Sequence, residues 1–398
     1  MKIITTILTV LTMTGVVYAE NAATSKPASA AVSPRTRDLF DFDWRFHLGD
    51  VPEANKSDFD DVAWAPVDLP HDFQIAGPFD EKTPDGPNSG YLPHGIAWYR
   101  KSFDVPADRK GKQFFLDFEG VYGITEVWIN GQNLGKHLNG YIGFQYDITP
   151  HVRPGERNVV AVRCDNSAKE TSRWYTGSGI YRHVWLLATE PLHVERFGTY
   201  VTTPDISSES ASVHIATEVR SHHADSRLCE LVTEIQDAKG QTIGQARSVV
   251  PVQPNDVYRF DQDVVVSKPV LWSPEMPYLY KAVSCVRHGK DLKDVYETPF
   301  GIRKIVFTTE DGLLLNGKKV FAKGVNIHHD NGCLGAAAFD RAIERRLEIL
   351  KEMGCNAIRL SHNPHAPALL EMCDRMGFLV MDEAYDKWTG QFNGWAVP

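Results

Sequence analysis

Apolar and polar residues alternate with a period of two in two stretches between residues 191 and 300. In one stretch the positions of one face are Val213, Ile215, Thr217 and Val219, and those of the other are Ser212, His214, Ala216 and Glu218. Successive side chains of a strand point to opposite faces, so this pattern predicts a strand with its first face buried. A second run repeats the pattern before the turn at Lys239-Gly240, at Cys229, Leu231, Thr233 and Ile235.

The strand-like segments fall into two groups. Residues 38–190 contain short apolar runs bounded by Gly, Pro and Asp, and no sustained 3.6-residue period. Asn130-Gly131 lies between two such runs and is typical of a two-residue hairpin, where both residues need positive φ. A jelly-roll sandwich therefore fits residues 38–190. Residues 191–300 have the size and alternation of an immunoglobulin-like sandwich.

The pattern changes after Gly301 to alternating strands and helices. Leu315-Asn316-Gly317-Lys318 predicts another hairpin, and residues 320–329 (VFAKGVNIHH) predict a buried strand. A helix follows, with one apolar face: Ile343, Leu347, Leu350 and Met353. Gly354 is expected to end it. A strand in NAIRLSHNP, a helix in PALLEMCDRMGF and a strand in FLVMDEA complete a β-α-β-α-β series, which indicates parallel strands.

This last region predicts the beginning of a larger domain. A closed (β/α)₈ barrel takes about 250 residues, and residues 301–398 supply only three β/α units of it. The predicted fold is a jelly-roll sandwich, an immunoglobulin-like sandwich and the first three strands of an incomplete (β/α)₈ TIM barrel. We expect partly uncovered helix faces around Leu347, Leu350, Leu369 and Leu370, and proteolytic cleavage after about Phe300.

The N-terminus resembles an export signal. Lys2 provides a short basic region, residues 3–17 are apolar, and Val17-Tyr18-Ala19 is a cleavage site of the A-x-A type. Residues 1–19 are predicted to be the signal peptide and residues 20–37 a flexible linker rich in Ala, Ser, Thr and Pro. No Cys follows the cleavage site, so no membrane anchor is expected, and we predict a periplasmic or extracellular protein.

Composition and charge disfavour some functional classes. The net charge is −9 and no run of Lys or Arg stands out, which disfavours a nucleic-acid partner. The six cysteines lie far apart without C-x-x-C spacing, so buried free thiols are expected, with one incidental disulfide left open. The chain is acidic and contains nine tryptophans. These tryptophans could bind sugars by stacking, or they could simply pack in a large core.

Polar side chains gather where the three predicted parallel strands end. These are His328-His329-Asp330, His362-Asn363 and Asp382-Glu383. Ligands bind at the carboxyl ends of parallel strands, so a functional cleft is predicted there. Asp382 and Glu383 are adjacent on one strand and cannot both enter that cleft. The region therefore holds no convincing pair of catalytic carboxylates.

Metal hydrolysis is the competing hypothesis for this cleft. Four imidazoles could converge on one ion: His328, His329, His362 and His365. However, barrel metallohydrolases favour H-x-H on one strand, whereas the adjacent His328 and His329 are expected to diverge. We therefore predict no metal site.

Several long motifs resemble glycoside hydrolase family 2, the β-galactosidase/β-glucuronidase family. KGVNIHHD, GCNAIRLSHNP and CDRMGFLVMDEA are similar to its opening barrel strands, while RWYTGSGIYRHVWL, LWSPEMPYLY and FGIRKIVF are similar to its sandwich motifs, in the family's order. The resemblance runs from about residue 38 to the end. It implies a retaining β-glycosidase, a carbohydrate substrate and no organic cofactor, with a homo-oligomer as an expectation for the longer enzyme.

The resemblance implies substrate contacts but no catalytic residue. His328 and His362 correspond to histidines of the family's cleft, Asn363 adjoins His362 in the same motif, and Arg173 corresponds to a sandwich loop that reaches the active site. A strand-end cap for His362 and an interface ion pair for Arg173 remain alternatives. The family's acid/base and nucleophile glutamates belong to the fourth and seventh barrel strands, which this sequence does not contain.

One departure concerns magnesium. Some family β-galactosidases follow Asp-Glu-Ala with a magnesium-binding Glu, but here Tyr385, Asp386 and Lys387 follow, and a charged lysine has no lone pair to donate. The segment resembles the exported bacterial β-galactosidase branch, with Trp388 as a sugar-stacking or a packing residue. The leading hypothesis is the N-terminal portion of a secreted β-galactosidase that is inactive alone. β-Glucuronidase and β-mannosidase remain open.

Two further hypotheses belong to other classes. In the first, the chain is a non-catalytic carbohydrate-binding or interaction protein with a vestigial barrel. In the second, the sequence is an artefact of a frameshift, an early stop or an incomplete gene. The reading frame beyond Pro398 distinguishes them, because a continuation with Asn-Glu in a strand context would support the enzyme.

Overall fold

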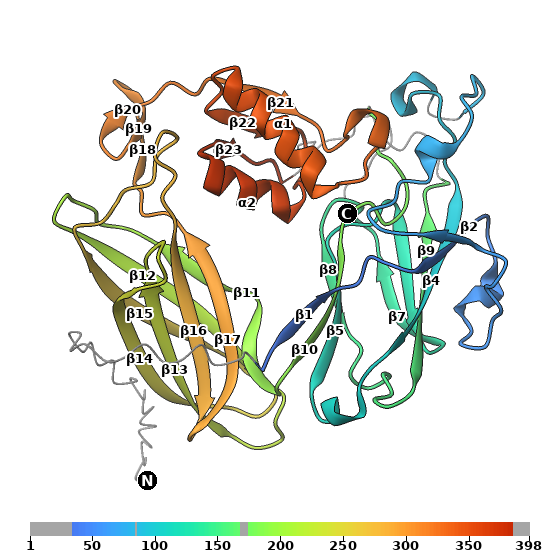
Figure 1. Cartoon of the computed structure of the whole chain (residues 1–398), viewed down its shortest axis with the longest axis horizontal. Helices are drawn as coiled ribbons and strands as arrows, with labels where there is room; N and C mark the ends of the chain where they lie inside the picture. Colours follow the sequence, from blue (N-terminus) through green and yellow to red (C-terminus); the bar gives the residue numbers. More distant parts are fainter. Residues whose placement is uncertain (1–33, 84–85, 168–173, 385–398) are drawn as a thin grey trace, which may run out of the picture. The chain divides into compact units, whose positions relative to one another are not determined.

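Alternating apolar positions in the first part of the chain form two facing antiparallel sheets (Figure 1). The computed structural model describes residues 34–83, 86–167 and 174–384. The first sheet has the order β1 (Thr36–Leu39), β10 (Val184–Thr189), β5 (Gln113–Phe118), β8 (Phe144–Asp147). The second has the order β3 (Ala65–Val67), β2 (Trp44–Leu48), β4 (Ile96–Asp104), β9 (Arg157–Asp165), β6 (Ile124–Ile129), β7 (Gln132–His137).

The core of this sandwich lies between the two sheets. Leu116 and Phe118 of β5 pack with Val127 of β6 and Val162 of β9, and all four side chains are buried. The predicted hairpin between β6 and β7 is confirmed, since Asn130 and its following glycine have φ of 50° and 83°. The helices here are short 3₁₀ turns: η1 (Pro52–Asn55), η2 (Gln74–Ala76), η3 (Gly86–Ser89) and η4 (Ala107–Arg109).

A second sandwich forms a compact unit of its own, comprising Leu192–Pro269 and Tyr280–Ile302. One sheet has the order β11 (Leu192–Thr202), β12 (Ser210–Ser221), β15 (Val257–Ser267). The other has the order β14 (Thr242–Val252), β13 (Arg227–Gln236), β16 (Tyr280–His288), β17 (Asp291–Phe300). The inward positions predicted on β12 and β13 are buried, and only Ala216 differs, because its small side chain is covered on the other face.

The second compact unit combines Pro34–Pro191 and Val270–Leu279 with the residues from Arg303 onward. Its last part begins with a hairpin sheet of β18 (Ile305–Thr308), β19 (Gly312–Leu315) and β20 (Lys318–Lys319). A parallel sheet of β21 (Gly324–Ile327), β22 (Ala357–Leu360) and β23 (Leu379–Met381) follows, as predicted. The connections are η5 (Gly332–Leu334), α1 (Asp340–Glu352) and α2 (Pro367–Met376).

Two sequence predictions about this part are wrong in detail. The strand expected over residues 320–329 is only four residues long, and Ile327 alone is buried in it, because β21 has one neighbour among the described strands. Met353 was assigned to the apolar face of the helix but is exposed. It is the C-terminal cap of α1, beyond the last regular turn, and Gly354 follows it with φ of 84°.

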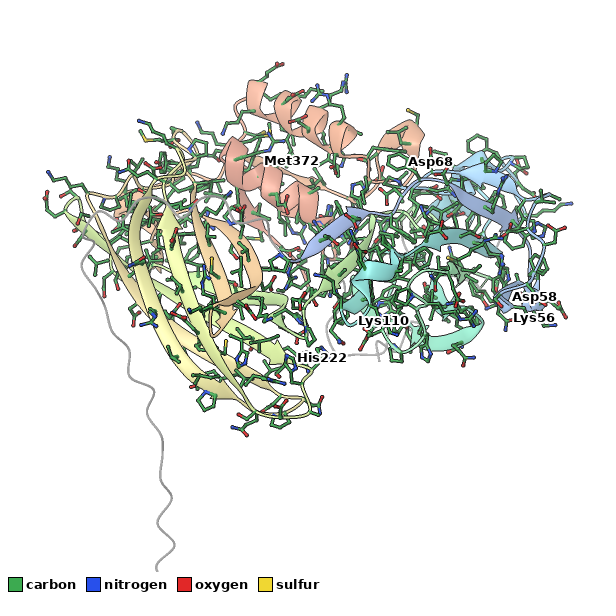
Figure 2. All side chains as sticks on the ribbon, turned by 60° about the horizontal axis from the view of Figure 1, so that its bottom comes forward. Lys56, Asp58, Asp68, Lys110, His222 and Met372 are labelled. Carbon is green, nitrogen blue, oxygen red and sulfur yellow. The ribbon has the colours of Figure 1, made fainter. Side chains whose placement is uncertain are left out.

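The apolar faces of both helices are largely covered, which contradicts the expectation of partly uncovered faces. Leu347, Leu350 and Leu369 are buried, and Leu370 is half-buried against the same cluster. Met372, labelled on α2 in Figure 2, is also buried. The helices pack on each other and on the short parallel sheet, so three strands and two helices already enclose a small core.

A chain of this length buries a core that is large enough to need no disulfide bonds. All six cysteines are free thiols, and Cys164, Cys229 and Cys373 are buried. Within the described ranges, no helix has the length and apolar character needed to cross a bilayer.

Candidate functional site

Three polar clusters lie at the same edge of the parallel sheet. His328 directly follows β21, His362 comes two residues after β22, and Glu383 comes two residues after β23. The strands are parallel and in register, so their carboxyl ends meet at one edge. These side chains therefore lie at the edge of the sheet where the sequence predicts a cleft, and the cleft itself stays a prediction.

Three rings make up the centre of this site, which we call the three-ring cluster: Trp174, His328 and His362. The ring centroids of the two histidines lie 5.3 Å apart, and the Trp174 ring lies 5.4 Å from His328 and 5.3 Å from His362. Trp174 comes from the first sandwich, and its indole N–H donates a hydrogen bond of 3.2 Å to the Tyr141 hydroxyl. A surface of rings bordered by imidazole nitrogens suits a ligand with apolar faces and many hydroxyls.

Glu383 orients one of these histidines. Its Oε2 lies 2.8 Å from His362 Nδ1, and its Oε1 accepts a 2.6 Å hydrogen bond from Arg359 Nε. Burial acts to raise the pKa of Glu383, but the hydrogen bonds from His362 and Arg359 outweigh it and lower that pKa, so the carboxylate is charged. A charged carboxylate only accepts hydrogen bonds, so Nδ1 of His362 carries a proton. In the neutral ring Nε2 is then an acceptor for a ligand hydroxyl.

Asp382, the neighbour of Glu383, has a different environment. Its side chain is exposed, and burial of part of the carboxyl raises its pKa. Both acids lie beyond the end of β23, so the expectation from strand alternation that they form no catalytic pair stays a prediction.

His329 points away from His328 into the protein. Its Nε2 donates a 2.9 Å hydrogen bond to the Thr176 carbonyl, and its ring lies edge-on to Tyr141 and Tyr181. Burial lowers the pKa of His329 to about 4, so the ring is neutral. The predicted divergence of the two histidines is confirmed.

The four histidines of the metal hypothesis do not converge. His329 and His365 border a small cavity of about 10 Å³ together with Arg182, and burial lowers the pKa of His365 to about 3. A guanidinium beside two imidazoles repels a cation. Across the residues that the structure describes, no group of three or more His, Cys, Asp or Glu is arranged to hold a metal ion.

Asn363 is placed differently from its histidine neighbour. Its side chain is 3% exposed, and neither its amide oxygen nor its amide nitrogen hydrogen-bonds within the described part of the chain. Arg173 and Trp388, the two other predicted contacts, lie outside the described residues, as do the signal peptide and the segment after Ala384. The structure therefore brings together His328 and His362 and leaves the roles of the other predicted residues as predictions.

The sequence does not indicate Trp174 as a site residue, nor the role of Glu383 in orienting His362. Trp174 directly follows Arg173, and an aromatic residue beside a predicted substrate contact was a usable signal. Glu383 was weighed only as a catalytic acid, because its distance from His362 and Arg359 cannot be derived from spacing alone. Both now belong to the site.

The sandwich segment after Trp174 is joined to the barrel strands by polar contacts. Arg182 Nη2 donates a 2.8 Å hydrogen bond to the Pro364 carbonyl, and the Tyr181 carbonyl accepts one of 2.9 Å from Ala338 N–H. His183 Nε2 lies 3.1 Å from Asp340 at the start of α1. Three successive residues thus connect the first sandwich to the (β/α) region and hold Trp174 near the strand ends.

These features define a class: a multidomain protein in which a sandwich supplies an aromatic side chain to the carboxyl edge of a parallel sheet. Family comparisons give the particular group. Residues 40–191 match the "Glycosyl hydrolases family 2, sugar binding domain", residues 192–303 match "Glycosyl hydrolases family 2", and residues 306–393 match its "TIM barrel domain". The chain belongs to glycoside hydrolase family 2, and the predicted three-part fold and family resemblance are confirmed.

Similar proteins include enzymes for two sugars. A β-galactosidase of Bacteroides ovatus is 47% identical over 91% of this chain and 42% of its own length. A β-glucuronidase of Formosa agariphila is 33% identical over 88% of this chain and 38% of its own. A family 2 member from Bacteroides cellulosilyticus is 41% identical, with a TM-score of 0.87 over 90% of this chain and 47% of that one. The chain thus spans less than half the length of these relatives.

Proposed function

We propose that this chain forms the N-terminal part of a retaining β-glycosidase whose substrates carry a terminal β-linked galactose. The observation that carries the proposal is the three-ring cluster at the carboxyl ends of the parallel strands. Its rings offer an apolar surface to one face of a sugar, and His362 Nε2 offers an acceptor to a hydroxyl. The higher identity to a β-galactosidase than to a β-glucuronidase supports galactose.

The chain's own residues account for binding and orientation. Retaining hydrolysis needs two carboxyl groups about 5–5.5 Å apart, one as acid/base and one as nucleophile. Glu383 is engaged by His362 and Arg359 and its neighbour Asp382 is not part of the cluster. We therefore infer that this chain holds the sugar while the catalytic glutamates belong to the remainder of a longer enzyme.

Sugar binding and turnover can be measured separately on the 398-residue chain. Titration calorimetry is expected to show binding of galactose in preference to glucuronate, weakened at least about tenfold by His362→Ala, a loss of about 1.4 kcal/mol. His214→Ala is the matched control, because His214 is paired with Asp263 on the surface of the second sandwich. Binding of neither sugar, or equal loss in both variants, would contradict the proposal.

Hydrolysis of nitrophenyl β-galactoside is expected to stay at the level of a buffer control. Turnover above that level that disappears in His362→Ala would show that the chain carries its own carboxylate pair. For the longer enzyme, the coding sequence downstream of Pro398 is expected to contain an Asn-Glu motif in a strand context.

We also propose that the protein is exported. The basic and apolar N-terminal regions and the small residue at position 19 support this proposal. Mass spectrometry of secreted or periplasmic material is expected to show an N-terminus at Glu20, and a retained Met1 in that material would contradict it.

A further inference from the structure

One buried carboxylate joins three loops beside the site. Asp72 is 4% exposed. Its Oδ1 accepts hydrogen bonds from the backbone N–H of Gln74 (3.0 Å) and Ser178 (2.9 Å). Its Oδ2 accepts one of 2.5 Å from the Tyr175 hydroxyl and one of 2.8 Å from Ala336 N–H. The donors come from the loop at η2, from the sandwich segment after Trp174 and from the loop that follows β21.

Two glycines allow the backbone to come close to the Asp72 carboxylate. Gly177 and Gly335 have φ of 69° and 62°, and a Cβ at either position would collide with Asp72 Oδ2. Glycine is therefore required at both loops for steric as well as conformational reasons. We call Asp72 and its four donors the Asp72 clasp.

We propose that Asp72 is a positioning residue that sets the distance between Trp174 and the two histidines of the three-ring cluster. Tyr175, which is held by Asp72, is the next residue after Trp174. Ala336, held by the same oxygen, closes the loop that begins at His328. The Asp72 side chain thus holds the segment that carries Trp174 and also the loop that begins at His328. This inference rests on the proposed sugar binding at the cluster.

The clasp needs a carboxylate and not merely a polar side chain. Three of the four donors are backbone N–H groups, which cannot accept hydrogen bonds. In an asparagine, one of the two carboxylate oxygens is replaced by an NH₂ group, which is a donor. This NH₂ group would face another donor, either Ala336 N–H or the N–H groups of Gln74 and Ser178. Asp72→Asn therefore breaks the clasp on one side while it preserves the shape of the side chain.

Two readouts on the full chain test this role. Carbon-13 labelled histidine gives signals for His328 and His362 that depend on the ring current of Trp174, and calorimetry gives the affinity for galactose. Asp72→Asn is expected to move both histidine signals and to weaken galactose binding at least about tenfold, since a misplacement of about 1 Å can cost on the order of 10²-fold at a site. Tyr175→Phe, which removes a single donor, is expected to cause a smaller change in the same direction.

The matched control is Asp294→Asn in the second sandwich. Asp294 is fully buried and accepts a 2.8 Å hydrogen bond from Val194 N–H, so its loss destabilises the chain without touching the site. Asp294→Asn is expected to leave the signals of His328 and His362 and the affinity for galactose as in the wild type. If Asp72→Asn and Tyr175→Phe also leave both unchanged, the clasp role is overturned. If the wild type binds no sugar but Asp72→Asn still moves the histidine signals, the proposed function fails and the positioning role stands.

Discussion

Neighbouring residues at the ends of the barrel strands have opposite environments. His328 contacts Trp174 and His362 at the site, whereas His329 is buried against Tyr141 and Tyr181. His362 is oriented by Glu383, whereas the next residue, Asn363, is buried and its amide has no hydrogen-bond partner among the described residues. In each pair one residue belongs to the three-ring cluster and its neighbour is buried beside it.

The buried amide of Asn363 gives a prediction at this scale. An unpartnered buried amide costs about 1–3 kcal/mol, so Asn363→Leu is expected to raise the free energy of unfolding of this chain by about 1 kcal/mol. If Asn363 contacts the sugar, the same variant weakens galactose binding. Denaturant unfolding and calorimetry measure the two effects.

Asn158→Leu is the control for Asn363→Leu. Asn158 is fully buried, and its amide exchanges hydrogen bonds with Asn130, Arg153 and Glu156. Its replacement is therefore expected to lower the free energy of unfolding by several kcal/mol. A comparable loss in Asn363→Leu would show that the Asn363 amide has partners.

At the scale of elements, the two helices end on glycines in different surroundings. Gly354 follows α1 with φ of 84° and open space around its Cα, whereas Gly377 follows α2 with φ of 77° against the Pro274 carbonyl. Alanine at either position costs about 1–2 kcal/mol in a left-handed conformation. Gly377→Ala adds a steric clash of about 1–3 kcal/mol, so it is expected to destabilise the chain more than Gly354→Ala in thermal unfolding. Equal losses would contradict this packing.

The start of α1 predicts a dependence on pH. Burial acts to lower the pKa of His183, but hydrogen bonds with Asp41 and Asp340 outweigh it and raise that pKa to about 9. Because this value exceeds the unfolded pKa of 6.5, the stabilisation is fully present below about pH 6.5 and is lost as the pH rises through about 9. The shift corresponds to roughly 3 kcal/mol.

His183→Gln tests this dependence. Unfolding free energies measured between pH 6 and 10 are expected to fall in the wild type across the upper half of that range and to fall less in the variant. Parallel curves for the two proteins would show that His183 does not carry the effect.

For the whole molecule, the region from Arg303 belongs with the first sandwich and is not an exposed appendage. Arg182 and the Asp72 clasp join them, and the helix faces that the sequence argument left open are covered. In hydrogen exchange the amides of Ala336 and Ala338 are expected to be protected together with β5 and β10. In Arg182→Met the amides of residues 303–384 are expected to exchange before those of the first sandwich. Arg259→Met, on the second sandwich, is not expected to change their exchange.

Early exchange of residues 303–384 in the wild type would instead support the cleavage after about Phe300 expected from the sequence. The domain limits 38–190, 191–300 and 301–398 stay predictions of the sequence. Peptides that exchange as cooperative units would define those limits experimentally.

The sequence by itself determined the elements, their order and the edge of the sheet where the site lies. Those depend on local properties: the periods of two and 3.6, the positive φ of Asn130 and Gly131, and the rule that parallel strands end on one side. Only the tertiary structure decided which side chains meet there. Trp174 reaches His362, and Asp72 holds Ala336 across 264 residues of chain, through contacts that no local pattern encodes. The physical reason is that strand and turn preferences act over a few residues, whereas the position of a ring or a carboxylate depends on the packing of elements distant in sequence.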